Sequence, residues 1–236
     1  MKHQYLGNFQ DHLTLLYGPP KIGKTQLTIR FPGVYLLPTE PGYKWANVRK
    51  SFIPNWATFI EFIKHMEKNR KLVKTVKMWG VDTVDNLSKF CMQYVCGREN
   101  IAHPSDEEWG KGWEAFRDEF THWIMRLTSL GPGTLFISHE QERDVISRSI
   151  TITKRMPAMP KTCYTVINNL VDVILNMGTV TETKLIKGKK KRVDVRCLFT
   201  KPAEHFDAGD RTGKLPDEIR FKTEQEAVDE ILACFD

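Results

Sequence analysis

The chain has 236 residues, of which 41% are hydrophobic and 27% are charged, so its composition is that of a globular protein and excludes disordered and fibrous classes. Its formal net charge of +6 permits a polyanionic partner without demanding one. No apolar run approaches the length of a membrane span, and the amino terminus lacks the apolar core of a signal peptide, so we expect a cytoplasmic protein with no membrane partner.

The motif that organises the chain is a phosphate-binding loop at residues 18–25. Its letters, GPPKIGKT, fit the P-loop pattern G-x-x-x-x-G-K-[ST], and an apolar run at residues 13–17 predicts a buried strand before it. A predicted helix opens after the loop, so N–H groups and the positive helix end favour bound phosphate. We expect Lys24 on the terminal phosphates and Thr25 on a Mg²⁺ ion. The candidate nucleotide-binding residues are Gly18, Pro19, Pro20, Lys21, Ile22, Gly23, Lys24, Thr25 and Gln26.

Three further apolar strands are predicted before residue 140, and a polar side chain follows each of them. The strands cover residues 34–37, 76–81 and 134–137. They lead to Glu40, Asp82 and His139 respectively. Apolar residues at helical spacing predict covering helices over residues 56–66, 84–95 and 113–127. Because ligands of parallel sheets bind at the carboxyl ends of strands, we expect these three side chains to meet the P-loop at one rim.

The remainder of the chain is predicted to begin irregularly and then to be rich in β structure. Residues 141–160 have no clear period, so we expect a long or partly disordered loop there. Two β-rich runs at 179–186 and 193–200 enclose the basic segment 187–192 and predict a hairpin with a basic turn. The other predicted elements are a short helix at 162–170, a fifth core strand at 171–175 and a terminal helix at 227–232.

The alternation of strands and helices predicts an α/β fold. We expect a mostly parallel central sheet flanked by helices, with a C-terminal β-hairpin. The length of the chain fits a single P-loop domain over residues 1–236.

Hydrolysis of a γ-phosphate needs a metal ion, positive charge on the phosphates and a group that activates water. Lys24 is expected to supply the charge, and Thr25 with Asp82 to hold the metal. Many P-loop ATPases have a glutamate directly after the aspartate at this strand end, but Thr83 takes that place here. The base must therefore come from another segment, and Glu40 is our first candidate.

Each further candidate has a second interpretation. Glu40 is either the base or an exposed turn carboxylate, and Glu140 is an alternative base. His139 reads either as a sensor of the γ-phosphate or as a structural histidine. Asp85 is expected to cap the helix that begins near Val84.

These residues resemble the RecA-like ATPase core, whose catalytic glutamate follows the second strand and whose fourth strand ends at a DNA-binding loop. The chain is more closely similar to phage-encoded ATP-binding proteins of the Sak type, which are single-strand annealing proteins of phage recombination. The segments that carry this resemblance are Thr39-Glu40-Pro41-Gly42, Trp109-Gly110-Lys111-Gly112-Trp113, Ile137-Ser138-His139-Glu140 and residues 209–216. The sequence departs from the pattern at Thr83 and Asp85. The resemblance implies a RecA-like P-loop NTPase fold with ATP and Mg²⁺ as cofactors.

The resemblance also implies contact with single-stranded DNA. It places residues 141–160 near the DNA, with Arg143, Arg148, Lys154 and Arg155 on phosphates. The alternative is a solvated surface loop, because acidic residues dilute its charge. The basic segment 187–192 is a second candidate, and a solvated turn is its alternative.

RecA-like ATPases commonly work as rings or filaments, so the resemblance implies a homo-oligomer. Arg211, or Lys201, is then the candidate that reaches the phosphates of a neighbouring copy. The alternative for Arg211 is a turn residue paired with Asp207 or Asp210. A single-stranded-DNA-binding protein is a further candidate partner.

The sequence therefore predicts a Mg²⁺-dependent ATPase that binds single-stranded DNA and assists phage-type homologous recombination by annealing or strand pairing. One alternative is a P-loop phosphotransferase that acts on a nucleotide or another small molecule. A second is a nucleotide-gated loader of other replication or recombination proteins. DNA-dependent hydrolysis separates these three functions.

Overall fold

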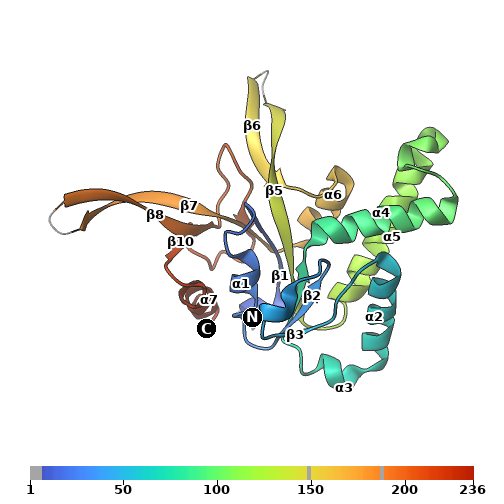
Figure 1. The fold of residues 1–236 in the computed structure, drawn as a ribbon, viewed down its shortest axis with the longest axis horizontal. Coiled ribbons are helices and arrows are strands. Elements are labelled where there is room, and N and C mark those ends of the chain that lie inside the picture. The colour runs from blue at the N-terminus through green and yellow to red at the C-terminus, as the bar shows by residue number, and fades with distance from the viewer. Residues whose placement is uncertain (1–6, 148–149, 187–188) are drawn as a thin grey trace, which may run out of the picture.

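The computed structural model describes residues 7–147, 150–186 and 189–236 (Figure 1). The strands are β1 (Leu13–Gly18), β2 (Val34–Pro38), β3 (Arg49–Lys50), β4 (Met78–Asp82), β5 (Gly133–Ser147), β6 (Ile150–Pro157), β7 (Val173–Ile186), β8 (Lys189–Phe199), β9 (Gly209–Asp210) and β10 (Glu218–Phe221). The α-helices are α1 (Lys24–Thr28), α2 (Trp56–Lys68), α3 (Arg70–Val73), α4 (Val84–Glu99), α5 (Lys111–Thr128), α6 (Lys161–Leu170) and α7 (Glu224–Ala233). Short 3₁₀ turns are η1 (Phe9–Asp11), η2 (Tyr43–Trp45), η3 (Pro104–Asp106) and η4 (Glu108–Gly110).

The centre of the molecule is a mostly parallel sheet, as the sequence predicts. Its strand order is β10-β8-β7-β1-β5-β4-β2-β3, and the strands from β7 to β3 run parallel. The strands β8 and β10 are antiparallel and form one edge. Parallel pairing aligns Gly18 with His139, and Pro38 with Asp82. The carboxyl ends that carry the predicted site residues therefore lie side by side.

Helices cover both faces of this sheet, because alternate strand residues point to opposite sides. Leu15 belongs to a core packed by α2, α4, α5 and α6, whereas its neighbour Leu16 belongs to a core packed by α1 and α7. The predicted apolar stripe of α2 is buried in the first core. None of the described helices combines the length and the apolar composition that a bilayer crossing needs.

The prediction of a loop at residues 141–160 is wrong for most of that segment. The strand β5 continues from the core to Ser147, and β6 returns antiparallel to it, with Glu142 opposite Arg155. The β-branched residues Ile150 to Thr153 favour this pairing. The charges between residues 140 and 144 hide the pattern, because a hairpin that leaves the body has no buried face to impose alternation. Arg148 lies outside the described residues.

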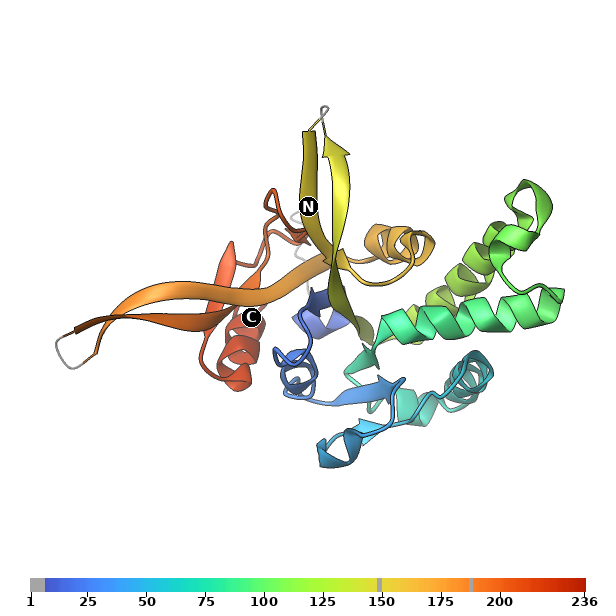
Figure 2. The same cartoon turned by 45° about the horizontal axis from the view of Figure 1, so that its top comes forward.

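The predicted basic hairpin is confirmed as β7 and β8, although its first strand is longer than expected. The predicted fifth core strand and the run at 179–186 form one continuous strand, β7. The hairpins β5–β6 and β7–β8 project from the body in different directions (Figures 1 and 2). Lys187 and Gly188, within the predicted basic turn, lie outside the described residues.

Candidate nucleotide-binding and hydrolysis site

The P-loop joins β1 to α1, and its glycines are needed for close backbone approach. A Cβ at Gly18 would lie 2.3 Å from the backbone oxygen of Met177. Gly23 has φ of 114°, and a Cβ there would lie 2.9 Å from a guanidinium nitrogen of Arg196. Side chains at these two positions would strain or displace the loop.

Lys24 lies at the start of α1 and is buried within the loop. Its Nζ donates to the backbone oxygens of Gly18 at 2.7 Å and Pro19 at 2.8 Å. Burial lowers the pKa of Lys24, and nearby carboxylates, Asp82 foremost, oppose that shift. A buried ammonium held mainly by carbonyl oxygens can exchange these weaker partners for phosphate oxygens.

Thr25 and Asp82 form the candidate metal site. The Oγ1 of Thr25 donates to Oδ2 of Asp82 at 2.6 Å. Asp82 is buried at the end of β4, and burial raises its pKa although the hydrogen bond from Thr25 opposes the shift. Within the described residues, no three His, Cys, Asp or Glu side chains gather to hold a metal by themselves. One hydroxyl and one carboxylate fit Mg²⁺, which takes its other ligands from phosphates and water.

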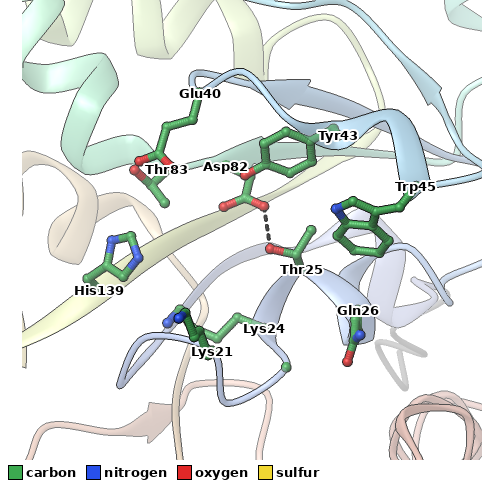
Figure 3. Close-up of a pocket in the computed structure, with 11 residues that line it drawn as sticks. Lys21, Lys24, Thr25, Gln26, Glu40, Tyr43, Trp45, Asp82, Thr83 and His139 are labelled. Carbon is green, nitrogen blue, oxygen red and sulfur yellow. Dashed lines mark hydrogen bonds between the residues drawn. The ribbon is translucent and has the colours of Figure 1, made fainter.

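Glu40 reaches the same site from the turn after β2. The preceding residue, Thr39, fixes this turn, since its N–H donates to the Asp82 oxygen at 2.7 Å and its Oγ1 accepts from Thr83 N–H at 2.9 Å. The Oε1 of Glu40 accepts from Nδ2 of Asn86 at 2.6 Å. Figure 3 shows Glu40 on the same side of Asp82 as Thr83, bordering the cavity.

His139 also borders the cavity, and Asp85 holds it. Its backbone N–H donates to Oδ2 of Asp85 at 2.8 Å, and its Nδ1 lies 3.1 Å from the same oxygen. The other carboxylate oxygen of Asp85 accepts from Ser138 Oγ at 2.5 Å. The prediction that Asp85 caps α4 is wrong, because Thr83 is the capping residue. Asp85 instead links the start of α4 to β5.

The cavity has a volume of about 360 Å³ and contains two aromatic residues that the sequence interpretation did not select. Tyr43 and Trp45 follow Glu40 on the 3₁₀ turn η2, with ring centroids 6.4 Å apart. Trp45 is 57% exposed, and it lies across Asp82 from Glu40 in Figure 3. Burial, and then the charge of Asp82, raises the pKa of Tyr43. Both aromatic residues are close to Glu40 in the sequence, and this closeness is the signal by which they could have been selected as cavity residues.

The three predicted DNA-binding residues that the structure describes, Arg143, Lys154 and Arg155, lie outside the cavity lining and have partners within the chain. Lys154 Nζ lies 2.5 Å from Oδ1 of Asp207. Arg143 donates to the backbone oxygen of Met159 at 2.8 Å. The guanidinium of Arg155 lies 5.4 Å from the ring centroid of Phe206. These three cations hold the root of the β5–β6 hairpin against the body.

Arg211 lies near the amino ends of β1 and β7, whereas the P-loop follows the carboxyl end of β1. The N–H of Arg211 donates to the Asp172 oxygen at 2.9 Å, next to the amino end of β7. Its guanidinium donates to the backbone oxygen of Asn169 at 3.3 Å and pairs with neither Asp207 nor Asp210. Within one copy, Arg211 is therefore not brought to the cavity.

Two alternative candidates also lie outside the cavity lining. Lys201 lies 2.5 Å from Oδ1 of Asp217 in an exposed ion pair. Glu140 has one buried carboxylate oxygen without a hydrogen-bond partner among the described residues, and its charge acts on Lys24. Of the two candidate bases, only Glu40 lines the cavity.

Comparison with known proteins agrees with this geometry. A family model described as an AAA domain matches residues 12–212, which is most of the chain. No curated protein matches the chain. The match and the mostly parallel sheet together establish a RecA-like P-loop NTPase fold, and they support nucleotide binding and hydrolysis. The chain belongs to the AAA domain family.

Proposed function

We propose that the chain is a Mg²⁺-dependent ATPase that binds single-stranded DNA and assists phage-type homologous recombination by annealing or strand pairing. The observation that carries the hydrolytic part is the convergence of Lys24, Thr25, Asp82 and Glu40 on one cavity. These four side chains come from three separate segments of the chain. Together they meet the needs of γ-phosphate hydrolysis for charge, metal ligands and a base.

Each side chain in the cavity has its own part in the proposed reaction. Lys24 neutralises charge on the terminal phosphates. Thr25 and Asp82 would hold Mg²⁺, which supplies further charge stabilisation at the phosphate oxygens. Glu40 accepts the proton of the attacking water. Asn86 donates to one oxygen of Glu40 and leaves the other oxygen to face the water.

The aromatic residues of η2 supply a surface for the nucleobase. Trp45 is largely exposed and borders the cavity together with Gln26 and Thr25. A flat, accessible ring beside a phosphate site suits stacking against a purine. We assign Trp45 to the base and Tyr43 to the wall between the base and Asp82.

The contact with DNA is supported by a strand that runs from the cavity into a hairpin. His139 borders the cavity, and the strand that carries it continues outward as the β5–β6 hairpin. Asp85 holds His139 by two contacts to one oxygen, so a change at the phosphates is passed to the same strand. The resemblance to annealing proteins of the Sak type assigns single-stranded DNA to that hairpin.

The decisive experiment measures phosphate release from ATP with and without single-stranded DNA, and with duplex DNA as the comparison. We expect stimulation by the single strand in the wild-type protein and no turnover in Lys24→Ala. If the protein neither binds DNA nor is stimulated by it, the recombination function is ruled out. Phosphate transfer to a small acceptor would establish a phosphotransferase, and nucleotide binding without turnover would establish a gated loader.

A further inference from the structure

The outer end of the β7–β8 hairpin carries four consecutive cations. Lys189, Lys190, Lys191 and Arg192 are all exposed. None of the four forms an ion pair with a carboxylate in the part of the chain that the structure describes. Because side chains alternate along a strand, Lys190 and Arg192 lie on one face and Lys189 and Lys191 on the other. The hairpin therefore presents positive charge on both faces.

The acidic residues of this hairpin do not neutralise that charge. Glu182 lies nearer the body, where its Oε1 accepts from Arg220 Nη1 at 2.9 Å. Asp194 accepts from Thr181 Oγ1 at 2.7 Å. Both carboxylates are thus engaged on the inner side of the basic run, and the charge at the outer end stays uncompensated.

This arrangement contrasts with that of the β5–β6 hairpin. There, Arg143, Lys154 and Arg155 contact the body of the same molecule, so binding phosphate with them requires those contacts to be replaced. The β7–β8 hairpin projects clear of the covering helices (Figure 2). Leu185, opposite Lys190, is 73% exposed and adds an apolar contact surface beside the cations.

We propose that the outer end of the β7–β8 hairpin binds the phosphate backbone of a nucleic-acid strand. Repeated cations that reach both faces at two-residue spacing, about 7 Å, suit a linear partner with repeating negative charge. The exposed leucine suits the apolar faces of unpaired bases. The inference deepens the proposed function, on which it rests for the identity of the partner, by adding a surface that residues 141–160 do not provide.

The same strand also contacts the P-loop, which joins the proposed surface to the nucleotide site. Arg196 lies four residues after Arg192, or about 13 Å along the strand. Its guanidinium packs beside Gly23 and is held by Glu224 and by the backbone oxygen of Lys222, the latter at 2.8 Å. A nucleic-acid strand on the hairpin would therefore bind to the element that supports the phosphate-binding loop.

The test compares two variants that lose the same number of exposed charges. The hairpin variant is K189Q/K190Q/K191Q, and the matched control is K68Q/K71Q/K74Q on α2, on α3 and at the C-cap of α3. The affinity of the full-length protein for fluorescent single-stranded DNA is measured by anisotropy over a series of salt concentrations. We expect the slope of log K against log salt to become shallower by about 2 in the hairpin variant, from roughly 0.7 per lost phosphate contact. The control should keep the wild-type slope.

A charge-preserving variant, K189R/K190R/K191R, guards against a folding defect and should bind as the wild type does. Equal slopes and affinities for the hairpin variant and the control would overturn the inference, as would loss of binding in the arginine variant. Binding to acidic polypeptide but not to nucleic acid would also overturn it. DNA binding through the hairpin without ATP turnover would overturn the proposed function and leave this inference standing.

Discussion

At the scale of single residues, the site separates two carboxylates by environment. Asp82 is buried beside the Thr25 hydroxyl, whereas Glu40 is exposed and bonded to the Asn86 amide. A buried carboxylate next to a hydroxyl suits a metal, and an accessible one suits proton transfer with water. The difference in environment supports the proposal that the two acids have different tasks within one cavity, as in other two-carboxylate sites.

The assignment of Glu40 as the base predicts a loss of turnover without a loss of binding. Glu40→Gln keeps the shape of the side chain and its contact with Asn86 but cannot accept a proton. We expect kcat to fall by about 10²–10⁴-fold, the usual contribution of a general base, with nucleotide affinity nearly unchanged. Phosphate release and fluorescent-nucleotide binding measure the two quantities.

Asn86→Ala, which removes only the orienting amide, should lower kcat by a smaller factor than Glu40→Gln does. Wild-type turnover in the glutamine variant would move the base to Glu140.

Because Asp82 is buried, we expect its carboxylate to lower the stability of the folded chain although the proposed reaction needs it. Burial raises the pKa of Asp82, so its ionised form is less favourable in the folded than in the unfolded chain. This cost is present at neutral pH and disappears as the pH falls below the ordinary aspartate value, about 3.9. Asp82→Asn should therefore raise the melting temperature at pH 7.5, by roughly 2–4 °C for each kcal/mol of burial cost that it removes, while turnover is lost.

Calorimetry of the nucleotide-free protein tests this expectation, with urea unfolding at several pH values to follow the expected shrinkage of the gain in acid. The exposed Asp118 gives a matched control, because Asp118→Asn removes the same charge without releasing a buried group. An unchanged or lower melting temperature in Asp82→Asn would show that Thr25 and Lys24 already offset the cost of burial.

At the scale of elements, the sequence was informative wherever a strand or helix packs against the core. The P-loop, Glu40, Asp82 and His139 could be placed at one rim, because buried parallel strands are recognisable as apolar runs and their carboxyl ends align. The β5–β6 hairpin could not be predicted in this way. It leaves the core after Ser138, so no buried face imposes the alternation that identifies a strand.

The side chains that orient the site were also beyond prediction from sequence. Asn86 and Asp85 lie on the first turn of α4 and contact Glu40, in the turn after β2, and His139 of β5, which are distant in the chain. Their roles depend on where α4 meets the sheet, which no local pattern encodes. Thr83 is a different case: it takes the capping role that Asp85 was expected to have, and threonine is itself a preferred capping residue.

At the scale of the whole molecule, the nucleotide cavity lies where two hairpins take root. The strands β5 and β7 flank β1, which leads into the P-loop, and each continues outward into a projecting hairpin (Figure 1). One hairpin reaches the cavity through His139, and the other reaches the P-loop through Arg196. Under the proposed function, these two contacts are the routes by which a partner on either hairpin would act on hydrolysis.

The position of Arg211 means that it can have its proposed role only in an assembly of several copies of the chain. Because it lies near the amino ends of the strands, opposite the P-loop, it can reach phosphate only in a neighbouring copy. Arg211→Ala alone should then lower turnover by about 10³-fold or more, as loss of an arginine finger does.

Co-assembly with Lys24→Ala should restore part of the activity, because one variant supplies the cavity and the other the arginine. With random head-to-tail mixing, about a quarter of the sites become complete. Steady-state ATPase assays of the mixed and separate variants measure this recovery.

Mixing Glu40→Gln with Lys24→Ala is the matched control, since both changes damage the same cavity and no copy supplies an intact one. Recovery confined to the Arg211 mixture would place the arginine in trans, and equal failure of both mixtures would exclude it.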